Sequence, residues 1–124
     1  IYSVVHLIVF TSWIGMFMLG IKPSFIIVVI LLFIIGFGNG TSALTFAVVR
    51  KSFPLAEVGV VTGFANTGGF LSAVLLPILF GNVLDLFPDD LSLGYHFGLI
   101  IPLLFSFMGL IGVILIKESK EETI

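Results

Sequence analysis

Residues 24–49 read SFIIVVILLFIIGFGNGTSALTFAVV, a continuous run without a charged side chain. A helix needs about 20 mostly apolar residues to cross the roughly 30 Å hydrocarbon core of a bilayer, and this run exceeds that length. After Ser24, polar residues occur only in its second half, where Asn39 and Ser42 accompany a cluster of glycines. The run therefore predicts a transmembrane helix.

Three further apolar runs flank this one along the chain. The four predicted spans cover residues 1–19, 24–49, 57–84 and 95–116, and a charged tail covers 117–124. Every charged residue lies at a junction, at the very start of the third span (Glu57) or in the tail, as expected when a charge at the bilayer centre costs at least about 2.5 kcal/mol. The sequence thus predicts an all-α fold, a polytopic membrane helix bundle with four transmembrane helices.

The composition excludes several other classes of protein. Hydrophobic residues make up 59% of the chain and charged residues 10%, whereas a soluble domain carries about 25% charged residues. The absence of cysteine excludes a disulfide scaffold, and a net charge of −2 without a basic patch argues against nucleic-acid binding. No span holds paired carboxylates or a cluster of metal ligands, so we expect no enzyme activity, no metal and no cofactor.

Lysine and arginine predict the orientation of the chain in the membrane, because cytoplasmic loops carry an excess of both. Arg50 and Lys51 lie between the second and third spans, and Lys117 and Lys120 follow the fourth. These positions fall on one side, and the other side holds only Lys22. The N-terminus, the 50–57 loop and the C-terminus are therefore expected in the cytoplasm, with the chain in the inner or plasma membrane.

Small residues form stripes along the predicted helices. In the second span, Asn39, Ser42 and Phe46 flank a stripe at helical spacing. That stripe consists of Gly36, Gly40, Ala43 and Ala47. The third span stacks Gly59, Gly63, Asn66, Ala73, Pro77 and Gly81 on one face, with Thr62 and Gly69 beside them. Such stripes are typical of close helix packing in lipid, and a second interpretation is that they form moving surfaces.

The region between the second and fourth spans carries a recognisable set of residues. In chain order these are Phe53-Pro54, Glu57, Gly59, Thr62-Gly63-Phe64, Asn66-Thr67-Gly68-Gly69-Phe70-Leu71, Pro77, Gly81 and Asp85. This set resembles helix 11 and the preceding loop of major facilitator superfamily transporters, nearest the sugar-phosphate permease and anion:cation symporter type. By position, the four spans are similar to helices 9–12, the C-terminal third of a twelve-helix fold.

The resemblance implies roles for two groups of residues. Asn39, Ser42 and Phe46 would face the substrate cavity. A second group would slide against the other half of the transporter: Gly59, Thr62, Gly63, Asn66, Gly69 and Ala73. The implied function is secondary active transport of a small solute by alternating access. The expected solute is an organic anion or metabolite, with a coupling proton or ion as a possible second partner.

Two other classes of protein fit the polarity pattern. One is a complete small four-span multidrug-type exporter, although the first span lacks the membrane-embedded Glu that such exporters carry. The other is a membrane scaffold subunit without transport activity. Because the chain opens at Ile1 inside an apolar run, we expect it to be a fragment whose partners are the lipid bilayer and N-terminal helices of the same chain.

Overall fold

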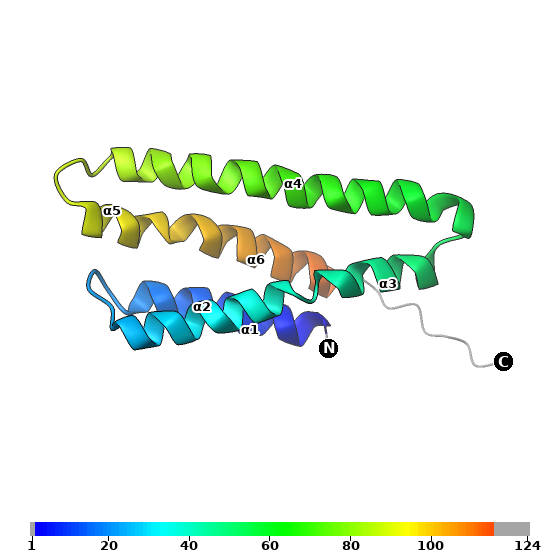
Figure 1. The fold of residues 1–124 in the computed structure, drawn as a ribbon, viewed down its shortest axis with the longest axis horizontal. Coiled ribbons are helices and arrows are strands. Elements are labelled where there is room, and N and C mark those ends of the chain that lie inside the picture. Colours follow the sequence, from blue (N-terminus) through cyan, green and yellow to red (C-terminus); the bar gives the residue numbers. More distant parts are fainter. Residues whose placement is uncertain (1, 116–124) are drawn as a thin grey trace.

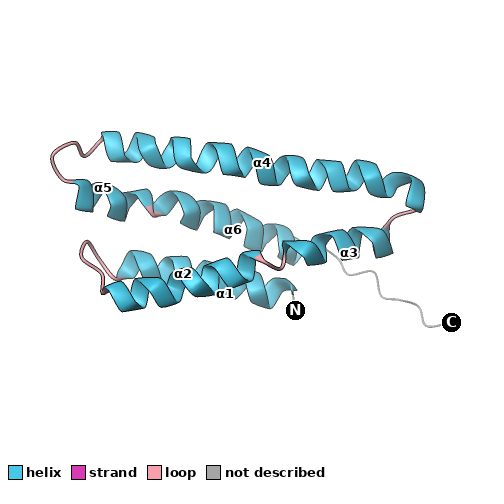
Figure 2. Ribbon diagram, viewed as in Figure 1, coloured by secondary structure: helices cyan, strands magenta, loops and turns pink. Residues whose placement is uncertain are grey.

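The computed structural model describes residues 2–115, and every regular element in that range is a helix (Figure 1, Figure 2). The helices are α1 (Tyr2–Met18), α2 (Phe25–Asn39), α3 (Ser42–Ser52), α4 (Leu55–Asp85), α5 (Leu91–Gly98) and α6 (Ile100–Leu115). The predicted all-helical fold class is confirmed for this range. Residue 1 and the predicted tail, with the two lysines that support the predicted orientation, lie outside the described residues.

Three helical stretches are long and apolar enough to cross a membrane. They are Phe25–Ser52, which combines α2 and α3, Leu55–Asp85, and Leu91–Leu115, which combines α5 and α6. The first predicted span corresponds to α1, a shorter apolar helix of 17 residues. At 1.5 Å per residue α1 is about 26 Å long, somewhat less than the hydrocarbon thickness.

The helices form a layered bundle in which α1 lies between α2 and α6. Figure 1 shows α4 along one edge, with α5 and α6 between it and the α1–α2 pair. Aromatic side chains join α1 to the last two helices. The rings of Phe10 and Phe107 are 5.5 Å apart, and those of Phe17 and His96 stack at 4.4 Å. Two aromatic side chains of α1 therefore pack against α5 and α6.

The last span begins four residues earlier than the sequence predicts. The predicted spans end at residue 84 and resume at residue 95, which predicts a polar loop over 85–94, yet α5 begins at Leu91. The side chain of Asp90 accepts a hydrogen bond from the Leu93 amide at 3.1 Å, which satisfies one of the free amides at the helix start. The end of the predicted loop is therefore the first turn of a capped helix.

A single residue, Leu99, separates α5 from α6. Pro102 has no backbone amide, so the carbonyl of Gly98 loses its partner four residues ahead. Gly98 also lies against α4, because a Cβ there would be 2.7 Å from Cε2 of Phe80. The proline thus explains the interruption, and the glycine explains how closely α4 and α5 pack.

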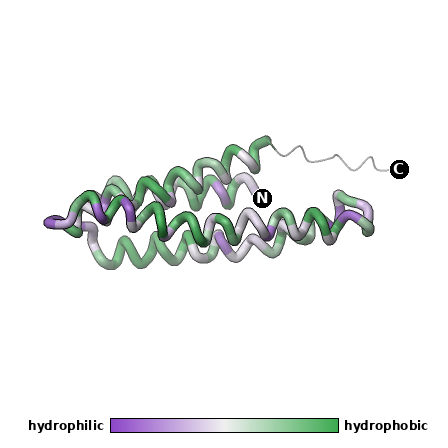
Figure 3. The backbone as a smooth tube through the Cα atoms, turned by 90° about the horizontal axis from the view of Figure 1, so that it is seen from above, coloured by the Kyte–Doolittle hydropathy of each residue, from purple (hydrophilic) through white to green (hydrophobic). Residues whose placement is uncertain are grey.

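The exterior of the bundle is apolar, and polar residues gather near the helix ends (Figure 3). The buried large apolar side chains among the described residues are Met16, Ile35, Val49 and Leu110. Phenylalanines such as Phe25, Phe33 and Phe64 are instead largely exposed on helix surfaces. An apolar exterior with so small a core suits a protein whose surroundings are lipid or other apolar helices.

Candidate functional site

The helix that begins at Phe25 is interrupted at Gly40 and Thr41, near the middle of its apolar span. The amide of Thr41 donates to the carbonyl of Gly38 at 3.1 Å, and the Thr41 hydroxyl donates to the same carbonyl at 2.7 Å. A bond reaching back three residues instead of four tightens the turn. One carbonyl therefore accepts two hydrogen bonds from the residue at the interruption.

Glycine permits α2 to approach α1 closely just before this interruption. A Cβ at Gly38 would overlap Cγ2 of Val9, so only a residue without a side chain fits there. Gly36 differs, since a Cβ there would have no atom of residues 2–115 within 4 Å beyond its own helix. The close approach is made by Gly38, which lies outside the predicted stripe that contains Gly36.

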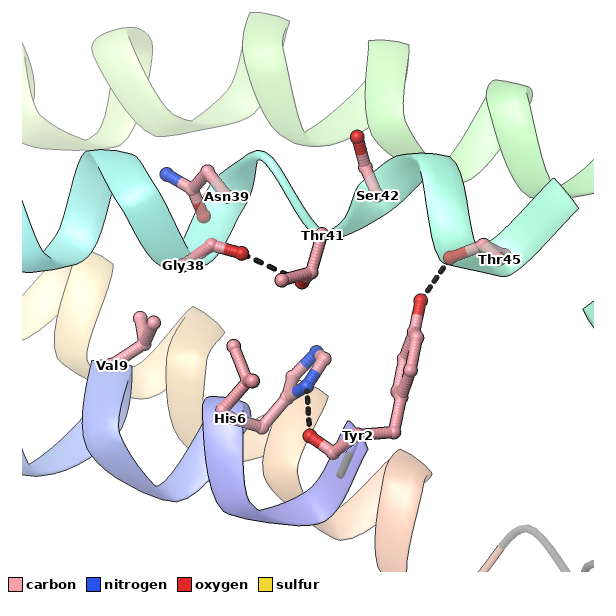
Figure 4. A pocket seen from close by; sticks show the side chains of 9 residues that line it. Tyr2, His6, Val9, Gly38, Asn39, Thr41, Ser42 and Thr45 are labelled. Atoms are coloured by element: carbon pink, nitrogen blue, oxygen red, sulfur yellow. Dashed lines mark hydrogen bonds between the residues drawn. The ribbon is translucent and has the colours of Figure 1, made fainter. Parts of the chain in front are cut away.

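A cavity of about 190 Å³ opens between α1 and the interrupted helix (Figure 4). Its polar lining comes from three helices and the break between two of them: Tyr2, His6, Asn39, Thr41, Ser42 and Thr45. One water requires about 10–15 Å³, so the volume holds several waters or one small solute. The cavity brings hydroxyl, imidazole and amide groups together inside an otherwise apolar bundle.

Two hydrogen bonds organise the α1 side of the cavity. The Tyr2 hydroxyl bonds to the hydroxyl of Thr45 on α3, and Nδ1 of His6 lies 3.0 Å from the carbonyl oxygen of Tyr2 (Figure 4). The Tyr2 and His6 rings stack with their centroids 5.1 Å apart. These contacts hold the α3 segment, which lies beyond the interruption, against the start of α1.

Of the three residues predicted to face the cavity, two line it and one does not. Asn39 and Ser42 line the cavity, whereas Phe46, on the next turn of α3, is 36% exposed and does not line it. Tyr2, Thr41 and Thr45 were not among the residues predicted for the site. Thr41 and Thr45 share a helical face with Gly38, at intervals of three and four residues, and that spacing was the signal available in the sequence.

The predicted face of α4 points away from the described bundle. A Cβ added at Gly59, Gly63 or Gly69 would have no atom of residues 2–115 within 4 Å outside its own helix turn. Asn66 and Ala73 are exposed, and Thr62 is half-buried at the edge of the face. None of the residues of α4 is buried, so this glycine face (Gly59, Gly63, Asn66, Gly69, Ala73) does not pack within the described chain.

Comparisons of the chain with protein-family models, curated proteins and solved structures found no match. Within the described residues, two features offer chemistry or a surface for a partner, the cavity and the α4 glycine face. The cavity supplies hydrogen-bonding groups at a helix interruption, and the glycine face supplies a surface that another backbone can approach closely.

Proposed function

We propose that this chain forms the C-terminal third of a secondary active transporter that moves a small organic anion or metabolite by alternating access. The observation that carries the proposal is the interruption at Gly40 and Thr41 beside a polar cavity, within a span of membrane-crossing length. Transporters bind solutes near the bilayer midplane at discontinuous helices, and glycine-interrupted apolar segments are the sequence feature that points to such sites.

The packing of the helices supports this assignment. In the family that the sequence resembles, helices 9 and 12 support the bundle from outside, helix 10 lines the cavity, and helix 11 meets the other half. The close packing of α1 on α6 suits two supporting helices. The cavity borders α2 and α3, and the exposed glycine face of α4 suits a helix that contacts a further bundle.

In an alternating-access mechanism, the cavity and the glycine face of α4 have separate roles. The cavity holds part of the solute, with Asn39 and Ser42 as the predicted contacts that line it. The glycine face of α4 slides against the other half of the transporter, because glycine and alanine let two backbones approach and Asn66 offers exchangeable hydrogen bonds. Sliding at this face opens the cavity first to one side of the membrane and then to the other.

The accessibility of Ser42 from the two sides of the membrane tests the proposal. The chain has no cysteine, so Ser42→Cys can be introduced into a full-length protein whose other cysteines have been removed. We expect an impermeant maleimide to label this thiol both in right-side-out and in inverted vesicles. Labelling from one side only would contradict alternating access and favour a scaffold. Ser52→Cys, at the exposed end of α3, is the control that should label from a single side.

A further inference from the structure

We infer that the cavity between α1 and the interrupted α2–α3 helix binds the uncharged, hydroxyl-bearing part of the solute. This inference rests on the proposed function and adds to it the chemistry that the cavity recognises. If the solute is an anion, its charged group is held outside this chain's described residues, and the hydroxyl groups of the same molecule lie against this cavity.

The chemistry of the cavity wall supports the inference. Within residues 2–115 the lining includes hydroxyl, amide and imidazole groups but no Asp, Glu, Lys or Arg. The nearest cation on the α3 side is Arg50, five residues beyond Thr45, the last residue of the lining. That separation is about 7.5 Å along a helix axis, and Arg50 is exposed and does not line the cavity. An anion in the cavity would lose water without gaining a cationic partner, which is strongly unfavourable.

The hydrogen bonds already formed determine what remains for a ligand. Nδ1 of His6 lies 3.0 Å from the carbonyl oxygen of Tyr2, which can only accept, so this nitrogen donates and Nε2 is the ring nitrogen left for a ligand. Among the described residues, no protein group is hydrogen-bonded to the side chains of Asn39 and Ser42, which are exposed. An imidazole nitrogen, an amide and a hydroxyl around one space match a molecule that both donates and accepts, as hydroxyl groups do.

The size of the cavity and its place along the apolar span agree with this assignment. A volume of about 190 Å³ exceeds what one water needs, and the cavity lies at the interruption near the middle of the apolar span. A solute that enters exchanges part of its hydration for the cavity wall, so each hydroxyl that faces the wall needs a protein partner. The cavity provides these partners from α1, α2 and α3 together, and a solute without hydroxyl groups would leave them unpaired.

Reagents of different charge at one introduced cysteine test the inference. Thr41→Cys places a thiol at the break between α2 and α3, where the Thr41 side chain lines the cavity together with His6 of α1 (Figure 4). The full-length protein, solubilised in detergent so that both ends are open to water, is treated separately with three methanethiosulfonates. These carry a hydroxyethyl, a sulfonatoethyl or a trimethylammonioethyl group. The same three rates at Ser52→Cys, in an exposed position, give the ratios for a freely accessible thiol.

At each cysteine, the reaction rate with the hydroxyethyl reagent is divided by the rate with each charged reagent. We expect both ratios to be roughly tenfold larger at Thr41→Cys than at Ser52→Cys, because an unpaired charge must be desolvated to enter the cavity. Equal ratios at the two sites would overturn the inference, as would faster reaction with the sulfonate or no reaction at all. If Thr41→Cys does not fold, the same comparison is made at Ser42→Cys.

The transporter proposal and this inference fail in different ways. One-sided labelling of Ser42→Cys, with the preference for the hydroxyethyl reagent retained, would refute alternating access and leave the hydroxyl-binding cavity in place. Two-sided labelling without that preference would refute the inference and leave the transporter proposal standing.

Discussion

The hydroxyl of Tyr2 on α1 is hydrogen-bonded to the hydroxyl of Thr45 on α3, 43 residues away along the chain. Among the described residues this is the side chain to side chain hydrogen bond that joins two helices. It lies beyond the interruption at Gly40 and Thr41, so it holds the α3 segment to the bundle independently of α2. The position of α3 relative to α1 therefore depends on a polar contact inside an apolar structure.

Removing this hydrogen bond is expected to destabilise the protein modestly. Tyr2→Phe keeps the ring that stacks on His6, and Thr45→Val keeps the shape of the side chain. Interhelical hydrogen bonds in membrane proteins contribute about 0.6 kcal/mol on average and at most about 1.7 kcal/mol. A double-mutant cycle measured by unfolding in mild detergent should give a coupling free energy in this range. Additive effects of the two substitutions would show that the bond does not stabilise the folded protein.

Gly38→Ala is expected to destabilise the contact between α1 and α2. The added methyl group overlaps Val9, and overpacking of this kind costs about 1–3 kcal/mol. Gly36→Ala is the matched control two residues earlier, where the described structure leaves space. Alanine is better in a helix than glycine by about 1 kcal/mol, so the control should be neutral or stabilising. Thermal unfolding of both variants checks the difference, and a Gly38→Ala variant as stable as the control would contradict the close approach.

The glycine face of α4 is tested by two substitutions in one helical turn. A Cβ added at Gly63 would have no described atom within 4 Å outside its own helix turn, and the side chain of Phe64 is 82% exposed. Neither Gly63→Leu nor Phe64→Leu should therefore disturb the packing of the described bundle. If the face slides on another half of the transporter, Gly63→Leu blocks that movement, whereas Phe64→Leu exchanges one lipid-facing side chain for another.

The measurement is two-sided labelling of Ser42→Cys in each of these two backgrounds, at matched abundance in the membrane. Gly63→Leu should restrict labelling to one side, and Phe64→Leu should leave it two-sided. Equal labelling in both variants would exclude the glycine face as a sliding surface.

The orientation of the chain is tested at the two ends of α4. Ser52 lies just before α4 and Ser92 shortly after it, and both are exposed. Cysteines introduced at these positions should react differently with an impermeant maleimide on intact cells, with Ser92→Cys labelled and Ser52→Cys protected. Arg50 and Lys51 at the end of α3 are the reason for this expectation, because basic residues remain in the cytoplasm. The reverse pattern of labelling would invert the topology.

Much of the fold could be predicted from the sequence, because membrane helices are determined by the length of apolar runs and the exclusion of charge. The long apolar runs that begin at Phe25 and at Leu55 form helical stretches long enough to cross a membrane, as this rule predicts. The start of α5 was missed because Leu91 and Ser92 look like loop residues until Asp90 is recognised as their cap. Composition indicates which segments enter lipid, whereas a cap depends on one side chain and one amide.

The candidate site was predictable only in part. Asn39 and Ser42 were predicted to face a substrate cavity because they flank the glycine stripe of a span that resembles helix 10 of the family, and both line the cavity of the structure. Thr41 and Thr45 were missed because a membrane helix can satisfy a threonine hydroxyl with its own backbone. Tyr2 could not be assigned, since its place opposite Thr45 depends on how α1 packs, and the helical period alone does not give that packing.

The close contact between Gly98 and Phe80 has a consequence for synthesis of the chain. The ribosome completes α4 before α5, yet α4 has no buried residue and is the least hydropathic of the three long apolar stretches. Its closest partner is the helix made immediately afterwards, where Gly94 and Gly98 receive side chains of Leu84 and Phe80. We expect α4 to enter the bilayer as a hairpin with α5 and α6, so that a chain ending at Asp85 is extracted by alkali more readily than one that continues through Leu115.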